Sequence, residues 1–398
     1  MSEKSFNYLL FLSPLFIVII FMNSLIFVRE AIYFILFYFI FMFLIYRNKL
    51  PHKILKNTLW IFIVSFIVYL SINTKYDKYG IIVILETGVM LAVFSLSVFL
   101  SIKGSYYKNA IWYLSTVYFW MFLVRSLVEL EQLKYGYNLS TGLSLFSLLP
   151  LIGVGADNLT KRKVFYVSIL CSLFILMYVG ARQAVVSILM FSFIAAMLNR
   201  NILSMQKKKI FIIFSVFVMI SIISFYPLYI MLSTIEHVSW VGGDGGSSFN
   251  FFNKRIGTRL DIWKHLLYYI SLDPLLGHGA NLSTSMLQPT SLIEFNMNRD
   301  NLSSHSTYLE IIYRIGFLGL FLFLLIFYKI IKILSNNLHV WEVKIISAYV
   351  LSLLVYISTS VILVFDSNLN SIFIWIALGV GIGASLKGCP LKKMIKLR

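Results

Sequence analysis

Long apolar runs recur along the whole chain, and they constrain its fold more than any other feature. Most have about 18 residues or more with few charges, the length that an α-helix needs to cross a bilayer. Hydrophobic residues make up 59% of the 398 and charged residues only 13%, with a mean hydropathy of +0.86. A soluble domain could not bury so much apolar surface. Because a helix satisfies its own backbone in lipid, the sequence predicts an all-α polytopic membrane protein.

We expect the whole chain, 1–398, to form one transmembrane helical domain of about twelve spans. The second expected span is short, so the first two could instead form a re-entrant hairpin. No small-residue cleavage site follows the first run, which indicates a retained helix. The spans are placed at 7–28, 31–46, 58–74, 80–101, 109–128, 139–157, 163–180, 183–199, 209–232, 306–329, 342–364 and 369–386.

The distribution of charge predicts how the chain is oriented. If the N-terminus is cytoplasmic, the cytoplasmic segments hold 22 of the 34 basic residues and 3 of the 16 acidic residues. This bias follows the positive-inside rule, so both termini are expected in the cytoplasm. The net charge of +18 is therefore interpreted as basic flanks facing anionic lipid, and not as a nucleic-acid surface.

One long polar segment, 233–305, interrupts the apolar pattern and falls on the extracytoplasmic side. Thr258-Arg-Leu-Asp261 matches a capping box and begins an amphipathic helix predicted over 258–271. Asp273-Pro274 ends this helix, and Gly277-His278-Gly279 follows as a turn. The helix is expected to lie on the membrane surface or across the bundle.

Arginine and histidine residues at this side are candidates for chemistry. Arg182 lies in a tight turn between two spans, and Arg255 and Arg259 lie in the long loop. Guanidinium groups bind phosphate oxygens with two parallel hydrogen bonds. His305 stands where the loop re-enters the membrane, and an imidazole can serve as a general base near neutral pH.

Three further residues are weaker candidates. Glu310 and Arg314 are four residues apart in the next span and can pair on one helix face. His278 is placed in the glycine turn. The two cysteines are far apart, and no metal-binding, nucleotide-binding or serine-hydrolase motif occurs, so no metal and no cofactor are expected.

Three segments resemble the bacterial O-antigen polymerase and O-antigen ligase family. They are Val179-Gly-Ala-Arg-Gln-Ala184, then Arg259-Leu-Asp-Ile-Trp263 with Asp273-Pro-Leu-Leu-Gly-His-Gly279, and finally Ser304-His-Ser-Thr-Tyr-Leu309 with Gly316-Phe-Leu-Gly319. Ser306 stands where the family has an asparagine. The family-like core covers 160–330.

The resemblance implies a GT-C-like helical fold and an inverting transfer of glycan from a polyprenyl diphosphate carrier. Arg182 and Arg259 would hold the diphosphate leaving group, and His305 would take the proton from the acceptor hydroxyl. The expected partners are the polyprenyl-diphosphate-linked donor and acceptor, the lipid bilayer, and flippase and chain-length regulator proteins. The active site would face the extracytoplasmic side of the bacterial cytoplasmic (inner) membrane.

Four functions stay open. The favoured one is a polysaccharide polymerase of O-antigen, capsule or exopolysaccharide repeat units. An O-antigen ligase with the same donor and a lipid A-core acceptor is the nearest alternative. A secondary transporter or flippase for an envelope glycan also suits twelve helices, although no related halves are found. A structural scaffold of an envelope complex is the fourth.

Overall fold

The computed structural model describes residues 58–74, 78–103, 105–128, 138–179, 181–199, 263, 266–280, 282, 306–358 and 369–388. These residues form helices and turns, and no strand occurs among them. The longer helices are α4 (Thr58–Ile72), α5 (Lys78–Lys103), α6 (Ser105–Val128), α8 (Asn138–Val154), α9 (Leu159–Val179), α10 (Arg182–Asn199), α13 (Thr307–Ser335), α14 (Trp341–Tyr356) and α15 (Leu369–Gly388).

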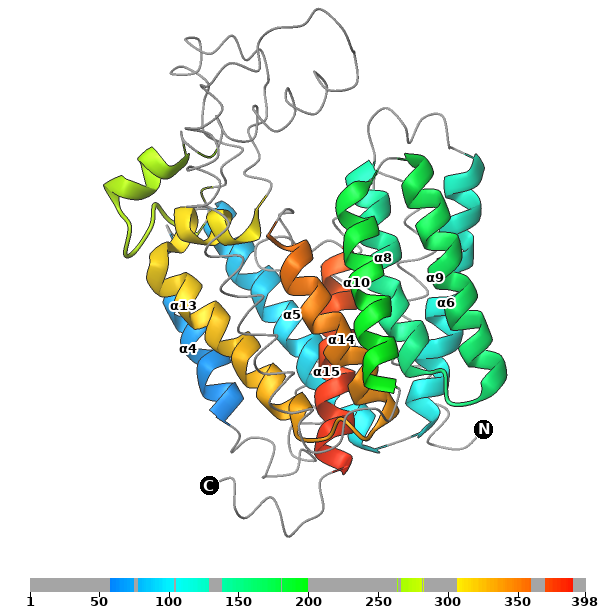
Figure 1. Ribbon diagram of the computed structural model, residues 1–398. Helices are drawn as coiled ribbons and strands as arrows, with labels where there is room; N and C mark the ends of the chain where they lie inside the picture. Colours follow the sequence, from blue (N-terminus) through cyan, green and yellow to red (C-terminus); the bar gives the residue numbers. More distant parts are fainter. Residues whose placement is uncertain are drawn as a thin grey trace, which may run out of the picture.

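The helices run side by side, and they alternate in direction from α4 to α10 and again from α13 to α15 (Figure 1). The two ends of the bundle differ chemically. One end, here called the basic end, holds the expected cytoplasmic cations of the described chain. These are Lys103, Lys108, Lys161, Arg162, Lys163, Lys329, Lys332, Lys344 and Lys387. The opposite end, here called the loop end, holds the start of α10, the 266–280 segment and the start of α13.

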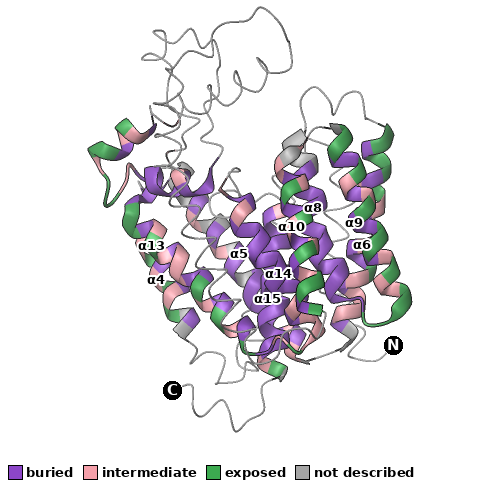
Figure 2. Ribbon diagram, in the orientation of Figure 1, coloured by how far each residue is buried: buried purple, intermediate pink, exposed green. Residues whose placement is uncertain are grey.

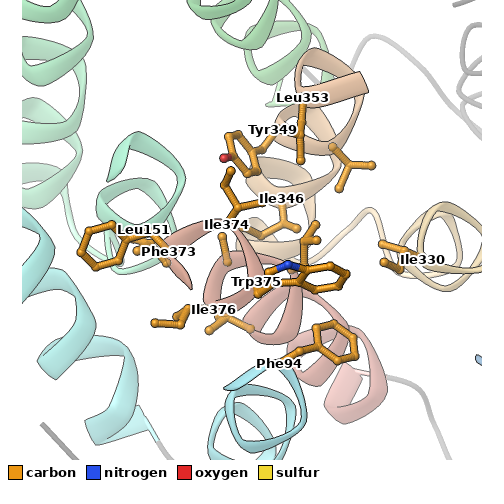
Figure 3. Close-up of a cluster of buried hydrophobic side chains, with 14 of the residues drawn as sticks. Phe94, Leu151, Ile330, Ile346, Tyr349, Leu353, Phe373, Ile374, Trp375 and Ile376 are labelled. Atoms are coloured by element: carbon orange, nitrogen blue, oxygen red, sulfur yellow. The ribbon is translucent and has the colours of Figure 1, made fainter. Parts of the chain in front are cut away.

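Helices α14 and α15 lie at the centre of the bundle, flanked by α5, α8, α10 and α13 (Figures 1 and 2). Side chains of α15 such as Ile374 and Trp375 are buried against Phe94 of α5 and Ile346 of α14 (Figure 3). The outward faces of α6, α9 and α13 are exposed and apolar (Figure 2). Apolar side chains thus fill the core and also cover the outer surface. This pattern is expected when lipid surrounds a bundle.

Small residues let α5 and α15 approach closely. Gly379 and Gly383 face α5, where an added Cβ atom would lie 2.6 Å from Phe94 O and 2.5 Å from Val98 O. The Ser101 hydroxyl donates to Val380 O at 3.0 Å across the same contact. This small-xxx-small spacing is typical of tightly packed membrane helices.

Aromatic and charged side chains tie the helices together at the basic end. The Arg162 guanidinium lies 4.3 Å from the centre of the Trp341 ring, and the Trp341 indole N–H donates to Gly153 O at 2.9 Å. Lys108 of α6 pairs with Glu342 of α14. Arg162 and Lys108 therefore hold neighbouring helices together at this end.

By length and composition, three helices among the described residues can cross a membrane: Tyr107–Val128, Thr307–Ser335 and Asn370–Lys387. The protein is accordingly an all-helical membrane protein as far as it is described. Shorter apolar helices stand at Ile61–Ile72, Val93–Ile102, Gly142–Val154 and Gln183–Asn199.

Most expected spans in the described part coincide with helices, with two differences. The span placed at 342–364 is helical to Tyr356 and then forms a turn at Ile357 and Ser358, where Ile357 O accepts a hydrogen bond from Thr307 N; 359–364 lies outside the described residues. The span placed at 306–329 continues to Ser335 and is broken at Ile315–Gly316. The spans at 7–28, 31–46 and 209–232 lie outside the described residues, so twelve helices and a GT-C topology stay predictions.

We predict that Gly379→Leu destabilises the bundle. The added side chain must displace the α5 backbone, and overpacking of this kind costs about 1–3 kcal/mol or more. Thermal unfolding in detergent should show a lower midpoint. Gly88→Leu is the matched control, because nothing lies within 4 Å of a Cβ added at Gly88. Equal midpoints for the two variants would contradict the close helix contact.

Candidate functional site

The loop end brings together elements that are far apart in the sequence. α10 begins at Arg182, and α13 begins after Ser306, whose side chain accepts from Leu309 N as the N-cap. Both helices pack against α14, and Tyr308 OH donates to Leu354 O at 3.0 Å near the end of that helix. The turn between 273 and 280 lies at the same end (Figure 1).

Helix α13 is broken in this region, and Gly316 is the cause. Gly316 has φ +68° and ψ −177°, and Ile315 before it has φ −131° and ψ +18°. The first conformation lies in the left-handed half of backbone space, which glycine adopts without steric cost. The upper part of α13, 307–314, therefore turns away from the axis of the lower part, 317–335 (Figure 1).

The 273–280 turn fills this break by exchanging backbone hydrogen bonds with it. His278 N donates to Tyr313 O, and Gly279 N donates to Arg314 O, each at 2.9 Å. In return, Phe317 N donates to Pro274 O at 2.8 Å and Leu318 N to Leu275 O at 3.4 Å. Groups that an unbroken helix would pair internally are thus paired with the loop, which avoids a cost of several kcal/mol per unsatisfied group in lipid.

Two glycines permit the backbones to meet this closely. A Cβ atom added at Gly316 would lie 2.0 Å from Leu275 O, and one added at Gly277 would lie 2.5 Å from Gly316 N. Gly277 also has a positive φ of +74°. The two family-like glycine motifs are therefore the two halves of one contact.

Helix α4 holds the turn from the other side. Tyr69 OH donates to Ile315 O at 2.9 Å, the third carbonyl released by the break. Asn73 Nδ2 donates to Leu276 O at 3.2 Å, and Asn73 O accepts from Ala280 N at 3.3 Å. Sequence reasoning missed Tyr69 and Asn73, since a tyrosine and an asparagine at the end of an apolar run give no signal of a distant partner.

Glu310 and Arg314 form the ion pair that their spacing predicts. Arg314 Nε and Nη2 each lie 2.7 Å from Glu310 Oε1, and both side chains are buried. Arg314 Nη1 also donates to Ala280 O at 3.2 Å. The pair therefore joins the upper part of α13 to the end of the turn, and its charges are mutually compensated.

His278 is half-buried beside this pair. Its Nε2 lies 2.7 Å from Tyr269 O, and its ring centre lies 5.0 Å from that of Tyr313. A carbonyl oxygen only accepts, so Nε2 carries the proton and, in the neutral ring, Nδ1 is the acceptor. The chain before the turn is helical over 266–272, with Leu266 and Ile270 packed on Ile312 and Tyr313.

The structure thus places three of the seven candidate side chains, Glu310, Arg314 and His278, around one loop–helix junction. Arg182 is placed as the first residue of α10 at the same end of the bundle, and nothing further is described for its side chain. Arg255, Arg259 and His305 lie outside the described residues, so their roles stay predictions. The described part of the predicted loop helix 258–271 is helical.

We predict that Gly316→Ala opens the loop–helix junction. The added Cβ atom collides with Leu275 O, and the positive φ strains any residue other than glycine. Backbone amides of 275–280 should exchange hydrogen for deuterium faster than in wild type. Leu318→Ala is the control, because its side chain is exposed and its backbone contacts stay in place. Unchanged exchange in Gly316→Ala would contradict the described junction.

We predict that Glu310→Ala is more destabilising than the double change Glu310→Gln with Arg314→Gln. The single change leaves a buried guanidinium without its counterion, a loss that costs about 3–5 kcal/mol. The double change removes both charges and keeps polar groups in place. The comparison is made from thermal unfolding midpoints in detergent, and a more stable single variant would argue against burial of the pair.

The comparisons with known proteins agree with the sequence motifs. Residues 167–324 match the family model described as O-antigen ligase. No curated protein matches the chain. The matched segment contains α10, the 266–280 segment and the broken part of α13, which are the elements that meet at the loop end. The match supports the resemblance: over residues 167–324 this chain is similar to the O-antigen ligase and polymerase family.

Proposed function

We propose that the protein is a polysaccharide polymerase of the bacterial cytoplasmic membrane. It joins polyprenyl-diphosphate-linked oligosaccharide repeat units of an O-antigen, capsule or exopolysaccharide at the extracytoplasmic face. The observation that supports glycan transfer is the family match over 167–324, because it spans all three motif segments. The match favours glycan transfer over the transporter, flippase and scaffold alternatives.

The proposed chemistry is a single displacement at the anomeric carbon of the donor glycan. Arg182 and Arg259, assisted by Arg255, bind the diphosphate. They compensate the charge that grows as the bond between the anomeric carbon and the diphosphate oxygen breaks. His305 accepts the proton of the acceptor hydroxyl as its oxygen forms the new bond. The anomeric configuration is inverted, and fixed guanidinium groups take the place that a metal ion has in other transferases.

The loop–helix junction has a supporting role in this proposal. Glu310 compensates the charge of Arg314, and Arg314 also donates to Ala280 O. We therefore assign Glu310 and Arg314 mainly to holding the turn beneath the bound substrate. Because Nε2 of His278 donates to Tyr269 O, only Nδ1 is left to accept a hydrogen bond from a substrate hydroxyl.

An O-antigen ligase is the second candidate, because the matching family is described as O-antigen ligase. The donor and the leaving group are the same in both reactions. Only the acceptor differs, since a ligase uses the lipid A-core and a polymerase uses another lipid-linked glycan. Flippase and chain-length regulator proteins would act beside either enzyme.

Reconstitution of the pure protein with polyprenyl-diphosphate-linked repeat units tests the proposal. Longer lipid-linked glycans, separated by gel electrophoresis and identified by mass, are the expected product. A parallel reaction supplies lipid A-core as the acceptor. Products on lipid A-core alone would favour the ligase, and no transfer to either acceptor in a competent assay would contradict both functions.

Site variants test the assigned residues separately from the function. Removing one preorganised charge-stabilising donor from an active site costs about 10²–10³-fold in rate, and Arg259→Ala should lose about that much. A general base contributes about 10²–10⁴-fold, and His305→Ala should lose a factor in that range. Arg259→Lys should recover little, because an ammonium lacks the two-pronged geometry. His237→Ala, in the same loop, is the control. Full activity of His305→Ala would show that another group is the base.

Chelation tests the metal-free mechanism. Addition of EDTA to the reconstituted reaction should leave the rate of chain elongation unchanged, because arginine side chains compensate the diphosphate charge. A rate that falls on chelation and returns with a divalent cation would overturn this part of the mechanism. Glycan transfer itself would stand in that case.

A further inference from the structure

The segment after the loop helix exposes leucines to an unusual degree for an extramembrane loop. Leu272 is 60% exposed, Leu275 67% and Leu276 49%, and Tyr268 beside them is 61% exposed. The opposite face of the same segment is also apolar, since Leu266 and Ile270 are buried against α13. These exposed apolar side chains stand on both sides of Asp273, whose carboxylate accepts from Leu276 N at 3.3 Å. Several exposed apolar side chains in so short a segment mark a surface that contacts something other than water.

The position of these leucines along α13 indicates how deep they lie in the membrane. Leu318 N donates to Leu275 O, so Leu275 lies level with residue 318 of α13. Lys329, which marks the basic end, is eleven residues further along the helix, or about 16 Å at a rise of about 1.5 Å per residue. A hydrocarbon core is about 30 Å thick, and helix tilt only lowers this height. The turn therefore lies within the bilayer thickness.

Helix α4 supports the same depth independently. From Thr58, where the predicted span begins after Lys56, to Tyr69 the helix rises about 16 Å, roughly half of the hydrocarbon thickness. Tyr69 and Asn73, at its far end, bind the carbonyls of Ile315 and Leu276. The turn thus lies level with the last residues of α4, within the bilayer thickness.

The exposed leucines also continue the outward faces of the neighbouring helices. Val68 and Ile72 of α4 are 51% and 71% exposed, and Phe317 and Phe321 of α13 are 50% and 58% exposed. The hydrogen bonds of Tyr69 to Ile315 O and of Phe317 to Pro274 O place these side chains around the turn. Irregular backbone is tolerated at this depth only where protein satisfies its polar groups, and the break in α13 does so.

We propose that residues 268–276 form a re-entrant membrane anchor. Leu272, Leu275 and Leu276 contact acyl chains of the leaflet opposite the basic end, and the backbone behind them is satisfied by α13 and α4. The described part of the long polar segment, 266–280, is then attached to the bilayer. The proposal is independent of glycan transfer, because it rests on burial, depth and hydrogen bonding alone.

Spin-label accessibility tests the anchor. Leu275→Cys is made in a background of Cys171→Ser and Cys389→Ser, labelled with a nitroxide, and placed in phosphatidylcholine and phosphatidylglycerol nanodiscs. Collisions with oxygen, which concentrates in lipid, are compared with those of a water-soluble nickel chelate. We expect the label at 275 to collide mainly with oxygen.

Two matched positions calibrate the measurement. Phe321→Cys on the exposed face of α13 should give a lipid pattern, and Asn158→Cys, exposed at the basic end, should give an aqueous pattern. If the label at 275 collides mainly with the nickel chelate, as the label at 158 does, the proposed anchor is wrong. Low collision rates with both reagents would mean that protein covers the leucines, which also overturns it. Unfolding midpoints of all three labelled proteins confirm that each variant is folded.

Discussion

The exchange of backbone hydrogen bonds between the 273–280 turn and the break in α13 is the interaction on which the loop end depends. An interrupted helix in lipid must give its released N–H and C=O groups to new partners. Here Pro274 O, Leu275 O, His278 N, Gly279 N and Tyr69 OH provide them. The upper part of α13 can therefore turn at Gly316, and the buried Glu310–Arg314 pair is placed against the end of the turn.

This junction stands on a bundle that is packed differently elsewhere. At the centre, Gly379 and Gly383 bring α15 against α5 through direct backbone approach. At the basic end, cations such as Arg162 stack on aromatic rings or pair with acids. The chain thus combines a close-packed centre with an end where an interrupted helix and an irregular turn satisfy each other's backbone groups.

Hydrophobic runs predicted the described helices well, because each run must be long enough to cross lipid and each basic cluster marks an end. The break at Gly316 was not predicted, since a glycine inside an apolar run is also common in unbroken membrane helices. Tyr69 and Asn73 were not predicted because their partners are more than two hundred residues away. The Glu310–Arg314 pair was accessible from spacing alone, as both residues lie on one helix face. The family resemblance came from short motifs whose glycines and charged residues stand in a fixed order.

Almost all hydrogen bonds between the 273–280 turn and α13 join main-chain atoms. Between Pro274 and Gly279, and between Tyr313 and Leu318, the bonded groups are the same in every amino acid apart from the missing N–H of proline. Leu275, Leu276 and Ile315 can therefore be replaced by other apolar residues without loss of these hydrogen bonds. Only the two glycines are held by geometry. Correlated substitutions between the turn and the helix should accordingly be weak, so this contact would be nearly invisible to methods that infer proximity from covariation.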